Sequence, residues 1–70
     1  MLQYKNKKGE IIEKYEDDCE SGEVFYNNKK VGLFEIEHDS NLGSYYHIVL
    51  HNGKGFHDHY HDDNDIIKHI

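Results

Sequence analysis

The chain has 70 residues, a formal net charge of −6, a single cysteine, and no arginine, proline or tryptophan. This length allows one domain, 1–70, with little room for the enclosed pocket of an enzyme, so we expect no catalytic activity. An acidic chain without guanidinium groups is poorly suited to bind DNA or RNA directly, no apolar run is long enough to cross a membrane, and a lone thiol is typical of a reducing, cytoplasmic compartment.

The first predicted element is a β-hairpin that pairs residues 2–6 with residues 10–15. Its corner is the stretch Asn6-Lys7-Lys8-Gly9. Asparagine suits the first position of a type I turn, and glycine supplies the left-handed residue of a three-residue loop. The two flanking segments are therefore expected to be antiparallel strands.

An acidic connection, residues 16–22, follows this hairpin. It contains Cys19, and the neighbouring carboxylates would raise the pKa of that thiol and keep it unreactive. With the start of the next strand, the connection offers five acidic side chains to a partner with a basic surface: Glu16, Asp17, Asp18, Glu20 and Glu23. The same charges would equally suit an ordinary solvated loop.

The second predicted hairpin pairs residues 23–27 with residues 31–37. Asn27 and Asn28 suit a two-residue turn with positive φ. An apolar set falls on the face opposite the expected core: Val24, Tyr26, Val31 and Leu33. Apolar residues on both faces predict either a sheet curled into a small barrel or sandwich, or a surface for a partner, for which a second copy of the chain (a homodimer) would serve.

The third predicted hairpin follows a polar connection, 38–44, and pairs residues 45–51 with residues 56–61. It contains five of the seven histidines: His47, His51, His57, His59 and His61. Alternate residues of a strand share one face, so the last three would stand in a row. Imidazoles beside Glu35 and Glu37 of the second hairpin would suit zinc, nickel or copper.

Two registers of this third hairpin remain open. If Gly53-Lys54-Gly55 forms the loop, His51 lies opposite His57, His47 lies opposite His61, and five histidines share one face. If Asn52-Gly53 forms a type I′ turn, Val49 faces Phe56 and His47 faces Asp58, so that face does not form.

The tail, residues 64–70, is predicted to add a helical turn. Asp63 or Asn64 would cap it, and Ile66 and Ile70 would share a face. The expected core of the molecule consists of Ile12, Phe25, Phe34, Ile36, Tyr46, Ile48 and Leu50. Phe25 is expected to lie across Gly32 on the neighbouring strand.

The three hairpins also read as copies of one unit. Asn6, Asn28 and Asn52 lie 22 and 24 residues apart, inside segments 4–18, 26–40 and 50–64 that open with Tyr or Leu, then x-Asn-x-Lys. Self-similarity at such a period suggests stacked supersecondary units. The pattern predicts an all-β fold, a small antiparallel meander of three hairpins. These hairpins resemble MORN-type repeats and antitoxin-like β-hairpin arrays, which implies an interaction module rather than an enzyme.

These observations favour a small acidic protein-binding module, of the kind with which a phage or mobile element inhibits a host protein. The alternative is a transition-metal-binding or pH-responsive module that uses the histidine row. Eight lysines and seven protonated histidines against fourteen carboxylates would give a formal charge of +1, so partner choice should depend on pH.

Overall fold

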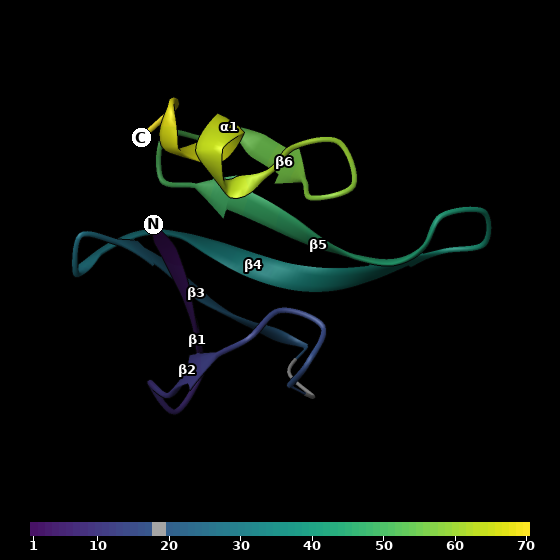
Figure 1. Cartoon of the computed structure of the whole chain (residues 1–70), viewed down its shortest axis with the longest axis horizontal. Helices are drawn as coiled ribbons and strands as arrows, with labels where there is room; N and C mark the ends of the chain where they lie inside the picture. Colours follow the sequence, from purple (N-terminus) through teal and green to yellow (C-terminus); the bar gives the residue numbers. More distant parts are fainter. Residues whose placement is uncertain (18–19) are drawn as a thin grey trace.

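The computed structural model describes residues 1–17 and 20–70 and shows one six-stranded antiparallel sheet with a short helix at its carboxyl end (Figure 1). The elements are β1 (Leu2–Asn6), β2 (Ile11–Ile12), β3 (Ser21–Tyr26), β4 (Lys29–Asp39), β5 (Gly43–Leu50), β6 (Gly55–His57) and α1 (Asp63–Ile67). The predicted all-β sheet and the helical turn are confirmed. The sheet stays open and does not close into a barrel.

The first two hairpin turns form as their residues predict. In the first, Asn6 N–H donates to the Glu10 carbonyl at 2.9 Å, and Gly9 takes the left-handed conformation with φ 85°. In the second, Asn27 and Asn28 have φ values of 51° and 63°, as a two-residue turn between β3 and β4 requires.

The third turn adopts neither predicted register. Leu50 N–H donates to the Lys54 carbonyl at 2.9 Å, and Gly53, with φ 90°, is the left-handed residue. The turn therefore comes earlier than the Asn-x-Lys pattern suggested. This register places Ile48 opposite Phe56, and both side chains are buried, so core packing rather than turn chemistry accounts for it.

The strand order is β2-β1-β3-β4-β5-β6, so β1 lies between β2 and β3. The short strands β2 and β6 form the two edges. β2 ends at Ile12 rather than continuing to residue 15, because the chain turns at Glu13 and Tyr15 has φ 67°. The following connection then crosses the core face, where the Tyr15 ring stacks on Tyr46 with 4.9 Å between centroids.

The predicted connection 38–44 is largely strand. β4 continues to Asp39 and β5 begins at Gly43, so only a tight turn remains. Asp39 Oδ1 accepts from the N–H groups of Asn41 and Leu42 at 2.7 and 2.9 Å, and this pairing lowers the pKa of Asp39. Because the Asp39 carboxylate satisfies the N–H groups of this turn, the β4–β5 hairpin extends further than the polar composition of residues 38–44 suggested.

One face of the sheet carries the core. Its buried side chains are Leu2, Tyr4, Ile12, Val24, Phe34, Tyr46, Ile48, Leu50, Phe56 and Ile66. Ile36 packs partly against them. The helix covers the β5–β6 side of this face through Ile66 and is capped by Asp62, whose Oδ1 accepts from Asp65 N–H at 2.9 Å. The cap is thus one residue before the earlier of the two predicted positions. The helix ends at Ile67, so Ile70, which was expected to share a face with Ile66, lies beyond it and is 47% exposed, whereas Ile66 is fully buried.

Two predictions about β3 are wrong. Val24 is fully buried and does not lie on the outer face, whereas Phe25 is only partly buried, with Lys5 Nζ 4.2 Å from its ring centroid. The cause is a bulge between Val24 and Phe25, which shifts the pairing with β4. The aromatic–glycine contact is also different, because Phe34 lies across from Gly22 and leaves no room there for a Cβ.

Candidate binding cleft

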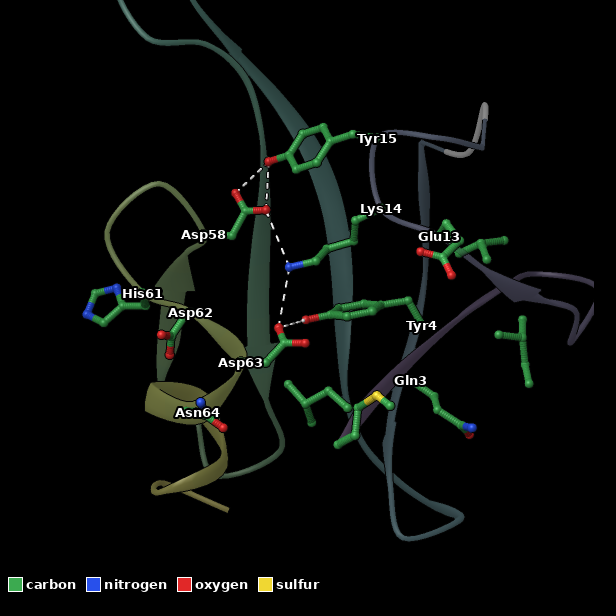
Figure 2. A pocket seen from close by; sticks show the side chains of 14 residues that line it. Gln3, Tyr4, Glu13, Lys14, Tyr15, Asp58, His61, Asp62, Asp63 and Asn64 are labelled. Carbon is green, nitrogen blue, oxygen red and sulfur yellow. Dashed lines mark hydrogen bonds and ion pairs between the residues drawn. The ribbon is translucent and has the colours of Figure 1, made fainter.

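A cleft of about 790 Å³ opens between the β1–β2 corner and the segment that joins β6 to α1 (Figure 2). Its lining residues are Met1, Leu2, Gln3, Tyr4, Ile11, Ile12, Glu13, Lys14, Tyr15, Asp58, His61, Asp62, Asp63 and Asn64. The two walls come from opposite ends of the chain, so the cleft exists only once the sheet has formed.

Lys14 joins the two walls at the centre of the cleft. Its Nζ lies 3.4 Å from Asp63 Oδ1 and 3.6 Å from Asp58 Oδ2. Dashed lines mark both ion pairs in Figure 2. The same ammonium lies 4.8 Å from the centroid of the Tyr4 ring, within reach of a cation–π interaction. One lysine thus contacts the carboxylate directly after β6, the carboxylate of the first residue of α1, and an aromatic face on β1.

Asp58 is the most connected carboxylate of the cleft. Tyr15 Oη donates to its two oxygens at 2.7 and 2.6 Å, and Tyr46 N–H donates to Oδ1 at 3.1 Å. Its side chain is only 6% exposed. Burial and then the bond to Asp58 raise the pKa of Tyr15 to about 12, so this hydroxyl stays protonated and donates.

Tyr4 holds the second carboxylate. Its hydroxyl donates to Asp63 Oδ1 at 2.8 Å, and its ring packs edge-on against Phe34 with 5.7 Å between centroids. Burial first, and the bond to Asp63 second, raise the pKa of Tyr4 far above its usual value. Both tyrosines therefore act as fixed donors that orient the carboxylates.

Tyr15, at the rim of the cleft, has a left-handed backbone conformation. A bulky residue with φ 67° is strained, and such residues concentrate at functional sites. The residue is 56% exposed at the rim although its hydroxyl is anchored. The chain thus holds an aromatic surface towards solvent at a conformational cost.

The charge of the cleft is predominantly negative. Its carboxylates, Glu13, Asp58, Asp62 and Asp63, outnumber its one lysine side chain, Lys14. Exposed apolar side chains, Ile11 at 64% and Met1 at 87%, lie on the β1–β2 wall. This combination suits a ligand with cationic groups on an apolar body.

The predicted acidic surface is only partly assembled. Glu16 and Asp17 continue the connection that forms one cleft wall, and Glu20, also exposed, lies at its far end, where its carbonyl accepts from Ile36 N–H at 2.7 Å. Asp18 and Cys19 lie outside the described residues. Glu23 belongs to the outer face of β3 and pairs with Lys30 at 2.6 Å, so it is separate from that surface.

The predicted second apolar face is reduced to a small patch. Leu33 is 50% exposed and lies opposite Val49, which is 41% exposed. Tyr26 and Val31 instead pack partly against the core. With Val24 buried, the outer face offers one adjacent apolar pair rather than a continuous stripe.

The histidine row does not form. β6 ends at His57, and the next residues turn back because Tyr60 and His61 N–H both donate to the His57 carbonyl at 3.0 Å. His57 faces His47 on the outer face, His59 lies in the turn, and His61 lines the cleft. His51 lies in the turn after β5. Among residues 1–17 and 20–70, no three His, Cys, Asp or Glu side chains are grouped to hold a metal ion.

A different group forms around His47 on the outer face. Its Nδ1 lies 3.0 Å from Glu37 Oε1, and Tyr45 Oη donates to Glu37 Oε2 at 2.8 Å. The Tyr45 bond is the main reason that the pKa of Glu37 is lowered, and the same bond raises the pKa of Tyr45. The His57 ring stacks on Tyr45 with 4.5 Å between centroids.

Sequence reasoning missed the residues that define the cleft, which are Tyr4, Lys14, Tyr15, Asp58 and Asp63. Their one local signal is the pair Lys14-Tyr15, one residue after the apolar dipeptide Ile11-Ile12, and such a pattern is too common to be informative. The chain matches no protein-family model, no curated protein and no solved structure. Within the part of the chain that the structure describes, no helix has the length and apolar character to cross a membrane.

Proposed function

We propose that this chain is a protein-binding module that receives a basic segment of another protein in its cleft. The observation that carries the proposal is the lining of the cleft, where four carboxylates face one lysine beside exposed apolar side chains. Electrostatic complementarity of this kind steers association and selects partners, while apolar contact contributes affinity.

Several features support a peptide segment as the ligand. The cleft is lined by two chain segments, its volume is that of a site for several side chains, and its rim carries the exposed Tyr15 residue. Nucleic acid would be repelled by the carboxylates. By binding a basic segment of its partner, the module would block that segment and inhibit the partner. This is the role we propose for a small acidic chain of this type.

A pH response is the second candidate function. The His47–Glu37 contact and the two histidine rings, His57 and His59, beside Tyr45 support it, because imidazoles titrate near physiological pH. Protonation would strengthen the His47–Glu37 pair and place two cations side by side at His47 and His57, whose ring centroids lie 5.2 Å apart. The charge of the outer face would thus change more than that of the cleft, whose lining contains one histidine, His61.

The test uses an unstructured acetylated and amidated peptide, (Lys-Val)₃, titrated into ¹⁵N-labelled protein. Chemical shifts should move for residues 13–17 and 58–64 and not for the outer face. Glu13→Lys should weaken binding by at least about fivefold, because it reverses a charge at the cleft wall.

The matched control is Glu35→Lys, which changes the net charge equally on the exposed outer face. It should alter affinity by less than about twofold, because screening weakens distant charges. Equal losses in the two variants would show unspecific attraction, and shifts centred on Leu33 and Val49 would move the binding site to the other face; either result contradicts the proposal.

A further inference from the structure

The Lys14 ammonium is enclosed by three side chains from distant parts of the chain, Tyr4, Asp58 and Asp63, which we call the cation cage. Two carboxylates lie 3.6 and 3.4 Å from Nζ, and the Tyr4 ring centroid lies 4.8 Å away. Carboxylate oxygens and an aromatic face are the groups with which proteins bind ammonium and guanidinium ions. The cage is therefore a cation site by its chemistry, and its occupant belongs to the same chain.

The walls of the cage are held by bonds that do not involve Lys14. Asp58 is fixed by Tyr15 Oη and by Tyr46 N–H, and Asp63 by Tyr4 Oη. Tyr4 is itself held in the core against Phe34. Removing the lysine would leave the two carboxylates in place, so the site is preorganised for another cation.

Lys14 itself fits the cage loosely. Charge-assisted N–H···O bonds are usually about 2.7–2.9 Å long, and the surface pair Lys30–Glu23 reaches 2.6 Å. Both contacts of Lys14 are longer, its side chain is 21% exposed, and it belongs to the connection after β2 rather than to a strand. One ammonium between two carboxylates also leaves a negative charge uncompensated.

We propose that the cation cage is the subsite in which the module binds a lysine or arginine side chain of its partner, and that Lys14 is a resident cation displaced on binding. This inference rests on the proposed function. A guanidinium fork could bond to both carboxylates together, which the Lys14 ammonium does only at long range. Displacement lowers affinity for any single cation, so the cleft would select segments that also fit its apolar wall.

The first experiment tests the cage with a free cation. In Lys14→Ala, n-butylammonium chloride should raise the melting temperature and shift the signals of Asp58 and Asp63, whereas sodium chloride of equal ionic strength should not. The wild-type protein should respond at least about tenfold more weakly, because its cage is filled. In Lys14→Ala/Asp63→Asn the response should be lost. A response no larger than that to sodium chloride, or one unaffected by Asp63→Asn, overturns the inference.

The second experiment uses the (Lys-Val)₃ peptide. Lys14→Ala should bind it at least about tenfold more tightly than the wild type, because the competing resident is gone. Lys14→Gln removes the charge but keeps most of the aliphatic part of the side chain, which contributes to packing, and it should show the same gain in affinity. Lys7→Ala, an exposed lysine in the β1–β2 turn, controls for the change in net charge and should gain less than about threefold. Equal gains for Lys7→Ala and Lys14→Ala overturn the inference.

The two experiments separate the two proposals. If butylammonium occupies the cage but no variant binds the peptide, the proposed function fails although the cage binds cations. If the peptide shifts the NMR signals of the cleft walls but binds the wild type and Lys14→Ala with equal affinity, the module binds basic segments, and the inference that Lys14 is displaced is wrong.

Discussion

The two faces of the sheet carry groups of the same chemistry in different surroundings. In the cleft, a tyrosine hydroxyl and an ammonium meet the carboxylate of Asp58; on the outer face, a tyrosine hydroxyl and an imidazole meet that of Glu37. The Asp58 side chain is 6% exposed, whereas that of Glu37 is 41% exposed. Water competes less for the bonds to Asp58 than for those to Glu37, so burial of the carboxylate, rather than the number of its contacts, decides which group stabilises the fold more.

The largest expected effect is that of Asp58→Ala. It removes the acceptor that Tyr15 Oη, Tyr46 N–H and the Lys14 ammonium share in a mostly buried place, and should lower the free energy of unfolding by about 3 kcal/mol. Urea unfolding followed by circular dichroism measures it. Glu37→Ala is the matched change on the outer face and should unfold at nearly the wild-type urea concentration. Similar losses for both variants would contradict the contrast between the two faces.

Tyr4→Phe should have an intermediate effect, about 1 kcal/mol at neutral pH, because a hydrogen bond to Asp63 is lost without creating a cavity. The pKa of Tyr4 is raised in the folded state, whereas tyrosine in the unfolded chain ionises near pH 10. Above pH 10 the unfolded state therefore binds fewer protons, and stability falls as pH rises. The fall should be shallower in Tyr4→Phe, while Tyr60→Phe, at an exposed position, should follow the wild type.

The smallest effect concerns the pH dependence of Glu37. Its lowered pKa contributes stability above the usual glutamate pKa, and that contribution is lost as pH falls through the folded-state value. An NMR titration of the Glu37 carboxyl carbon should give a midpoint below 4.5. Tyr45→Phe should move it upward, because the Tyr45 hydroxyl is the largest cause of the shift. An unchanged midpoint would assign the shift to His47 instead.

The turns were the most predictable part of the fold, because each depends on residues next to one another. Asn27 and Asn28 tolerate positive φ, and Gly9 supplies the left-handed position of its loop, whatever the rest of the chain does. The third turn shows the limit of this local logic. Asn52 lies in the loop, but the register follows from the burial of Ile48 against Phe56.

The cleft could not be predicted, because its residues meet through the strand order. Placing β1 beside β3 brings Tyr4 near the start of α1, and the connection after β2 carries Lys14 and Tyr15 to Asp58. No local pattern encodes these contacts. The histidine row failed for a related reason: alternation at positions 57, 59 and 61 has meaning only while the strand lasts, and β6 ends at His57.

The brevity of the two outermost strands has a consequence for the behaviour of the protein in concentrated solution. β2 spans Ile11–Ile12 and β6 spans Gly55–His57, so neither side of the sheet offers a long run of unpaired amide groups on which a neighbouring molecule could template. Although most of this chain is extended, it should therefore resist stacking into cross-β fibrils. Lengthening β2 or β6 would remove that protection.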